Sequence, residues 1–141
     1  MQMVEYIKLK QQYWAKRKNI KLVPPSAKHK ERTYTSKLED NLFQPLSKKA
    51  LGAFSLGGGN ELGNGITPGK MQALHSSSAI AVNFFDYWTG QKDLSVLAQA
   101  LKAPSPKVSN ISFEQKYPIS EKLKRYPPNL DVVLESTDSL V

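Results

Sequence analysis

The sequence predicts a chain of the α+β or α/β class, in which a helical first half precedes the strands of a mixed sheet. Apolar residues recur at helical spacing in several segments before residue 103, most densely over residues 76–88. Residues 111–117 alternate apolar and polar side chains, and residues 129–134 form an apolar run behind two prolines. Both of these later patterns are typical of strands.

The first predicted helix covers residues 3–18, where good helix formers surround an apolar face made of Val4, Ile7 and Trp14. Two prolines at positions 24 and 25 end the helical region, and a polar, basic connection follows. We therefore expect a basic N-terminal helix or arm over residues 1–36 and the body of the domain over residues 37–141.

The formal charge of +8 is concentrated in this arm. Residues 1–37 hold ten Lys or Arg and two acidic residues, whereas the rest of the chain holds ten of each sign. Such an arm neutralises phosphates, releases counterions and binds nucleic acid without sequence preference. DNA is the expected partner and RNA the second choice. The predicted nucleic-acid-binding residues are Lys8, Lys10, Lys16, Arg17, Lys18, Lys21, Lys28, Lys30 and Arg32.

Two other interpretations of the arm stay open. Basic termini are common as solvated extensions with no dedicated ligand. The arm could also be a folding partner of the body, in which case its removal costs solubility and not DNA affinity. Tyr6, Tyr13, Trp14 and Tyr34 interleave with the basic residues and could stack on bases or dock the arm onto the body.

A second helix is expected from Ser36 to about Ala50, with Ser36 as its N-cap and leucines at helical spacing. Pro45 indicates a kink or an early break in it.

Residues 57–65 contain five glycines in nine positions, so a phosphate-binding loop has to be considered. The spacing fits neither a Walker loop nor a dinucleotide fingerprint, and a turn before the next helix is the favoured interpretation. Glu61 lies in this loop. An isolated glutamate in a polar loop is usually solvated.

Residues 76–88 form the clearest predicted helix, because serines at 76–78 can cap its start and apolar residues cover nearly its whole circumference. We expect it to be largely buried. A shorter helix with one buried stripe is expected over residues 93–102. His75, at the start of the longer helix, has no second histidine at metal-ligand spacing, which disfavours zinc.

Asp131 is the best single candidate for chemistry, because it is an acidic residue in the apolar run that follows Pro127-Pro128. A carboxylate in a hydrophobic strand costs folding energy unless it is paired, exposed at the strand end or bound to a cation. The structural alternative is a carboxylate bonded to a neighbouring backbone amide.

Read together, residues 70–85 and the sequence Asn-Leu-Asp-Val-Val at 129–133 resemble the PD-(D/E)XK nuclease superfamily, within its restriction-endonuclease-like group. The resemblance implies a mixed sheet of that fold and hydrolysis of DNA with bound Mg²⁺. It implies that Asp131 is the first catalytic acidic residue and a metal ligand, and that Glu61 is a further metal ligand.

The superfamily's acidic-x-Lys triplet is absent. Residues 136–139 are expected to form a turn and residues 140–141 to begin the strand that would carry the triplet. Glu135-Ser136-Thr137 does not replace it, because Thr137 stands where a lysine is needed. We therefore expect a fragment or truncated frame, inactive alone, that needs a missing C-terminal half or an oligomeric partner. The alternative is a non-catalytic nucleic-acid-binding or accessory protein that uses the basic arm.

The composition predicts a soluble, cytoplasmic protein without a membrane partner. The chain has no cysteine, and no apolar run approaches the roughly 20 residues that a membrane span needs.

Overall fold

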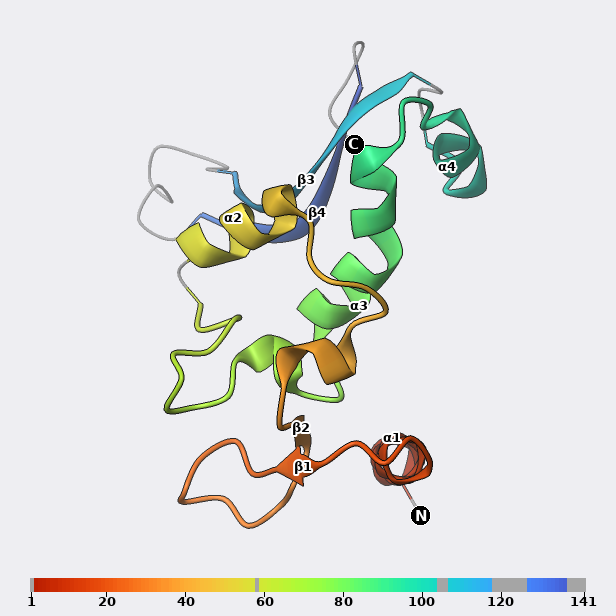
Figure 1. Cartoon of the computed structure of the whole chain (residues 1–141). Helices are drawn as coiled ribbons and strands as arrows, with labels where there is room; N and C mark the ends of the chain where they lie inside the picture. The colour runs from red at the N-terminus through yellow and green to blue at the C-terminus, as the bar shows by residue number, and fades with distance from the viewer. Residues whose placement is uncertain (1, 58, 104–106, 118–126, 137–141) are drawn as a thin grey trace. The chain divides into compact units, whose positions relative to one another are not determined.

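The computed structural model describes residues 2–57, 59–103, 107–117 and 127–136. Along the chain lie α1 (Met3–Arg17), β1 (Leu22–Val23), β2 (Tyr34–Thr35), η1 (Leu38–Asn41), α2 (Lys48–Leu56), η2 (Lys70–Gln72), α3 (Ser77–Phe85), η3 (Asp86–Gly90), α4 (Ser95–Ala100), β3 (Val108–Lys116) and β4 (Asn129–Ser136); the η elements are 3-10 helices (Figure 1). The strands form two separate antiparallel pairs, β1 with β2 and β3 with β4. The α+β fold class is therefore confirmed.

The chain folds as two units. The first comprises Met1–Pro45 and Gly58–Ile80, and the second comprises Leu46–Gly57 and Ala81–Val141. The predicted arm, residues 1–36, belongs to the first unit. Its separation from the remaining chain as a domain stays a prediction.

The first unit is held together largely by side chains that bond to the backbone. Gln11 Nε2 on α1 donates to the carbonyl of Leu74 at 2.9 Å. Gln72 Nε2 donates to the carbonyl of Thr35 at 2.8 Å, while Gln72 Oε1 accepts from the Gly69 amide at 2.7 Å. Asn41 Nδ2 reaches two further carbonyls on the segment that contains η2. These bonds connect α1, β2 and η1 to residues 69–74. They also give each of the polar groups a hydrogen-bond partner, as buried polar groups require.

The second predicted helix is wrong in its extent. Only the four residues of η1 are helical near its predicted start, Leu42 is extended with φ −116° and ψ 145°, and α2 begins at Lys48. Pro45 lies in the gap, and proline removes a helical hydrogen bond and crowds the preceding turn. Ser36 caps neither helix; Ser47 caps α2, accepting from the Ala50 amide at 3.1 Å.

A buried carboxylate fixes the start of α2. Asp86, 3% exposed, accepts from the Ser47 amide at 2.7 Å and from the Ser47 hydroxyl at 2.5 Å. The Thr89 hydroxyl also lies 3.4 Å from the same carboxylate. Two charge-assisted bonds to one N-cap residue hold the turn before α2 in place.

The core of the second unit lies between α2 and the β3–β4 hairpin. The rings of Phe54 on α2 and Phe113 on β3 lie 5.8 Å apart between centroids, and both are almost fully buried. In the hairpin, Ile111 pairs with Leu134 and Phe113 with Val132. The two predicted strands are thus confirmed. The alternation at residues 111–117 is typical of a strand because successive strand residues point to opposite faces.

The helix predicted over residues 76–88 is confirmed as α3 followed by η3, and Ser76 caps it by accepting from the Ala79 amide at 3.2 Å. Its predicted burial is only half right. Ala79, Ala81 and Val82 are buried, whereas Ile80 is 68% exposed and Phe84 is 51% exposed. An apolar circumference shows that a helix can be buried, but only the face that meets another element is covered.

The helix predicted over residues 93–102 is confirmed in a shorter form as α4, with Leu94, Leu97 and Ala98 buried. The turn and strand predicted after residue 136 lie outside the described residues, apart from Ser136, which ends β4. Within the described ranges, no helix has the length and apolar character needed to cross a membrane.

Candidate nucleic-acid interface and candidate metal residues

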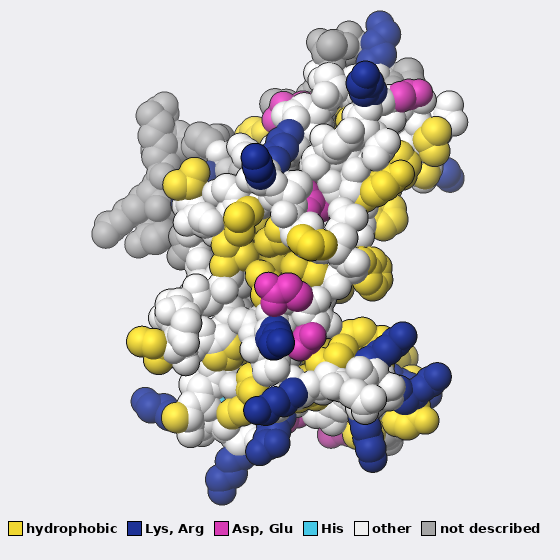
Figure 2. Space-filling view, in the orientation of Figure 1, with side chains coloured by type: hydrophobic (Ala, Val, Ile, Leu, Met, Phe, Trp, Pro, Cys, Tyr) yellow, Lys and Arg dark blue, Asp and Glu magenta, His cyan; other side chains and the backbone are white. Residues whose placement is uncertain are grey.

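All nine predicted basic residues are exposed. Lys8, Lys10, Lys16 and Arg17 lie on α1 and Lys18 follows it, while the other four lie around the β1–β2 connection, at Lys21, Lys28, Lys30 and Arg32. Figure 2 shows dark-blue side chains around the part of the molecule where Figure 1 places α1, β1 and β2. All nine charged side chains therefore lie at the surface of the first unit.

The helix α1 exposes nearly all its large side chains, and Ala15 is its one buried residue. Tyr6 is 45% exposed, Tyr13 60% and Trp14 40%. Lys10 Nζ lies 5.3 Å from the centroid of the Tyr6 ring, and the Arg17 guanidinium carbon lies 6.0 Å from that of Tyr13. Both are cation–π pairs at i, i+4 spacing, so each ring carries a cation beside it.

Two hollows flank Tyr13 on this helix. One, of about 420 Å³, is lined by Tyr6, Leu9, Lys10 and Tyr13. The other, of about 260 Å³, is lined by Tyr13, Trp14, Arg17 and Lys18. Each therefore combines aromatic surface with positive charge. The pairing of Tyr6 with Lys10 and of Tyr13 with Arg17 was not predicted, although the repeated spacing of Tyr and Lys or Arg four residues apart is visible in the sequence.

Lys8 has a different environment from Lys10 and Arg17. Its Nζ lies 3.8 Å from Glu31 Oε2, and the pair borders a hollow of about 300 Å³ that His75 also lines. His75 is exposed. Glu31 therefore partly neutralises the Lys8 charge.

Asp131 lies on β4, half-buried, between Leu130 and Val132, whose partners on β3 are Gln115 and Phe113. Among the described residues, no hydrogen bond or ion pair to its carboxylate is found. The structural alternative predicted a bond to a neighbouring backbone amide. No such bond is present in the described part of the hairpin.

Glu135, four residues further along β4, is instead held by its neighbours. Its carboxylate accepts from Asn110 Nδ2 at 2.8 Å and from Ser112 Oγ at 3.0 Å. These two bonds, with a smaller contribution from the charge of Lys49, hold the pKa of Glu135 below its ordinary value of 4.5. Lys49 in turn bonds to Asn110. Sequence reasoning missed this cluster because its members become neighbours only when β3 and β4 pair.

Glu61 is buried and not solvated, at 9% exposure. Its Oε1 lies 3.7 Å from Lys70 Nζ, so its charge already has a partner. Glu61 belongs to the first unit and Asp131 to the second. Asp131 and Glu135 are separated by four residues of strand, about 13 Å, which is too far for one metal ion. Within the described ranges, no group of three or more His, Asp or Glu could hold a metal ion.

The glycine-rich loop accepts hydrogen bonds from the amides of the residues that follow it. Asn64 Oδ1 accepts from the amides of Ile66 at 3.0 Å and Thr67 at 2.8 Å, and the Lys70 amide donates to the Asn60 carbonyl at 2.8 Å. Gly63 has φ +81°, a conformation that side chains disfavour. These bonds hold the loop against residues 66–70 as a turn before α3, in agreement with the favoured interpretation of the sequence.

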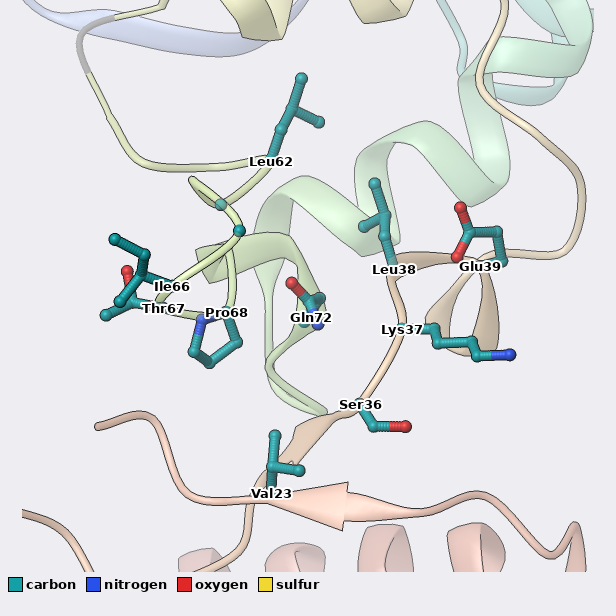
Figure 3. A pocket seen from close by; sticks show the side chains of 12 residues that line it. Val23, Ser36, Lys37, Leu38, Glu39, Leu62, Ile66, Thr67, Pro68 and Gln72 are labelled. Atoms are coloured by element: carbon teal, nitrogen blue, oxygen red, sulfur yellow. The ribbon is translucent and has the colours of Figure 1, made fainter. Parts of the chain in front are cut away.

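A hollow of about 460 Å³ lies beside this loop in the first unit. Figure 3 shows Gln72 between the loop residues Leu62 to Pro68 and the segment Ser36 to Glu39. The Gln72 amide is satisfied by Thr35 and Gly69. In the described residues, no buried side-chain nitrogen or oxygen lacks a hydrogen-bond partner. The hollow therefore presents no polar group that requires a ligand.

Comparison with known proteins places this α+β chain among restriction-endonuclease-related proteins. A family model described as "Restriction Endonuclease associating with ARP" matches residues 7–141, and the chain belongs to that family. No curated protein and no solved structure matches the chain significantly. The resemblance to a restriction-endonuclease-like group is thereby confirmed at the level of the family.

Proposed function

We propose that this chain serves in a metal-dependent DNA endonuclease of the PD-(D/E)XK type. In this proposal Asp131 contributes one carboxylate to a Mg²⁺ site, and the basic residues of the first unit contact the DNA backbone. The observation that carries it is Asp131 itself, a half-buried carboxylate on an antiparallel hairpin with no partner among the described residues. Membership of a restriction-endonuclease family supports the same substrate class.

The chemistry of the donor set limits this proposal. Mg²⁺ prefers carboxylate oxygens and keeps several waters, so one carboxylate gives only weak binding. Glu61 is paired with Lys70, and Glu135 is bonded to Asn110 and Ser112. The described residues alone therefore do not form a complete metal site. In this proposal Asp131 supplies one ligand, and the other ligands are not among the described residues.

The basic residues supply sequence-independent affinity. Each Lys or Arg that meets a phosphate releases a counterion, so the binding constant falls as salt rises. Because all nine predicted residues are exposed and only Lys8 among them has an ion-pair partner in the described residues, most of this charge is available.

The test compares the complete protein expressed from its gene with its Asp131→Asn variant, using supercoiled plasmid and Mg²⁺. Asp131→Asn is expected to abolish nicking while the midpoint of urea unfolding stays within the error of the wild type. Glu135→Gln is the matched control on the same strand and is expected to retain nicking. Wild-type nicking by Asp131→Asn, or its unfolding at much lower urea, would assign Asp131 a structural role instead.

A second candidate is a non-catalytic nucleic-acid-binding or accessory protein of a restriction system. The absence of a three-ligand cluster from the described residues favours it. It predicts a complete wild-type protein that binds DNA in a salt-dependent way yet does not nick plasmid with Mg²⁺ or Mn²⁺. The nicking assay on the wild type therefore separates the two candidates before any substitution is made.

A further inference from the structure

The two cation–π pairs of α1 form a repeat along the helix. Tyr6 with Lys10 and Tyr13 with Arg17 are separated by seven residues, which is about two turns and about 10.5 Å along the axis. Each pair presents one flat ring and one cation. The hollows on either side of Tyr13 lie in the same row.

This row is on the side of α1 that the first unit does not cover. Ala15 is fully buried and Gln11 bonds to Leu74, so they mark the covered side. At 3.6 residues per turn, Tyr6 and Tyr13 lie about 160–180° around the helix from Ala15. Their exposure is therefore a consequence of where the helix docks, and the row is available to a partner.

Charge and ring chemistry select the partner. Glu5 is the one acidic residue of α1, against Lys8, Lys10, Lys16 and Arg17. A row of cations attracts a polyanion, and exposed rings beside them can stack on bases. Duplex DNA keeps its base faces covered by neighbouring pairs, so it could use the cations but not the rings. A lipid surface suits a helix with separate apolar and charged faces, whereas on α1 the hollows combine Leu9 and the tyrosine rings with Lys10 and Arg17 on one side.

We propose that α1 is a platform for single-stranded nucleic acid. Bases stack on Tyr6 and Tyr13, and phosphates meet Lys10 and Arg17, so that one nucleotide uses a ring and the cation beside it. The inference rests on the proposed nucleic-acid function and deepens it, because it names unpaired nucleotides as the bound form. Trp14 and Lys18 line the second hollow together with Tyr13 and Arg17.

The test measures binding of a fluorescent oligothymidylate about 20 nucleotides long, and of a duplex of equal length, by anisotropy over a range of salt. Tyr6→Leu/Tyr13→Leu is expected to weaken oligothymidylate binding at least tenfold, because stacking contributes roughly 1–3 kcal/mol per base. The conservative Tyr6→Phe/Tyr13→Phe variant keeps both rings and is expected to bind within about twofold of the wild type. Phe43→Leu removes an exposed ring outside α1 and is expected to bind like the wild type.

A second variant separates stacking from charge. Lys10→Ala/Arg17→Ala is expected to weaken binding of both the single strand and the duplex, and to reduce the slope of log K against log salt by up to about two. The leucine variant should leave that slope unchanged. Circular dichroism of each variant confirms that α1 is retained.

The outcomes distinguish this inference from the function on which it rests. A wild type that binds neither form of DNA overturns both. A wild type that binds duplex, with leucine variants that bind oligothymidylate as tightly as the wild type, overturns the platform alone. Equal losses for duplex and single strand in the leucine variant also overturn it, as does binding to anionic phospholipid vesicles without binding to oligothymidylate.

Discussion

The helix α1 and the β3–β4 hairpin differ in the solvent exposure of their large apolar residues. On the hairpin, Ile111, Phe113 and Val133 are each at most 3% exposed. On α1 the large side chains face outward and Ala15 is the one buried residue. The polar groups differ as well, since the Glu135 carboxylate is held by two hydrogen bonds whereas Lys10 and Arg17 on α1 lie over aromatic rings.

This difference indicates that the two regions have different roles, one in stability and the other in binding. Buried apolar area is the main source of folding stability, so the hairpin and α2 stabilise their unit. Exposed rings and cations add little to stability, yet they are the groups with which proteins hold polyanions and bases. Substitutions of the buried apolar residues of the hairpin should therefore change stability, and substitutions of the exposed rings and cations of α1 should change binding.

The largest effect on stability is expected for Phe113→Ala. This ring is 1% exposed and packs against Phe54 at 5.8 Å, so its loss leaves a cavity that costs about 3–5 kcal/mol. Urea unfolding measures the change. Tyr13→Ala on α1 is the control and should cost within about 0.5 kcal/mol. Equal losses of unfolding free energy in the two variants would show that α1 and the hairpin contribute alike to stability.

The next largest loss of stability is expected for Gly69→Ala, which tests whether the first unit is tightly packed away from α1. A Cβ at Gly69 would lie 2.2 Å from the Glu61 carbonyl oxygen and 2.4 Å from the Gly63 nitrogen. Gly69→Ala should therefore cost about 1–3 kcal/mol in urea unfolding.

Gly52 on α2 is the matched control, because in the described part of the chain nothing outside its own helix backbone and chain neighbours would lie within 4 Å of a Cβ at this position. Gly52→Ala should stabilise by roughly 0.5–1 kcal/mol through helix propensity. A neutral Gly69→Ala would show that the loop moves without cost.

A pH dependence tests the polar face of the hairpin. The pKa of Glu135 is lowered by the bonds from Asn110 and Ser112, so its stabilising contribution is present above 4.5 and is lost as pH falls through the folded value. The urea midpoint of the wild type should fall between pH 6 and pH 3. Glu135→Gln and Ser112→Ala should each show a smaller fall. The same pH dependence in all three proteins would remove Glu135 from this account.

The smallest effect on stability is expected for Lys10→Ala/Arg17→Ala. Exposed cation–π pairs contribute about 0.5–1 kcal/mol at most, and each cation is solvated. The unfolding free energy should therefore stay within about 1 kcal/mol of the wild type, although nucleic-acid binding falls. A loss above about 2 kcal/mol would mean that these pairs hold α1 in place and that the helix is not primarily a binding surface.

Much of this architecture was predictable from local patterns. The spacing of residues 3–18 predicted α1 to within a residue of its observed end at Arg17, and the alternation at 111–117 predicted most of β3. The serines before α3 predicted its cap, which Ser76 supplies. These features depend on a residue and its near neighbours in sequence, where backbone sterics and capping act.

The predictions that were wrong involve residues whose partners lie far away in the sequence. Ser47, not Ser36, caps α2, and it does so while bound to Asp86, which is 39 residues away. Glu61 was expected to be solvated but is buried beside Lys70. The metal-site prediction for Asp131 and Glu61 stays a prediction, because its ligands would have to come from segments that no sequence spacing places together.

The sequence by itself determined the basic first 37 residues, the row of aromatic and basic residues on α1, and the acidic residue on an apolar strand. Only the tertiary structure decided that Ala15 and not Tyr13 is covered, and that Glu135 and not Asp131 is held by β3. The physical reason is that periodicity and charge are properties of neighbouring residues, whereas burial and hydrogen-bond pairing require groups that the fold brings together from distant parts of the chain.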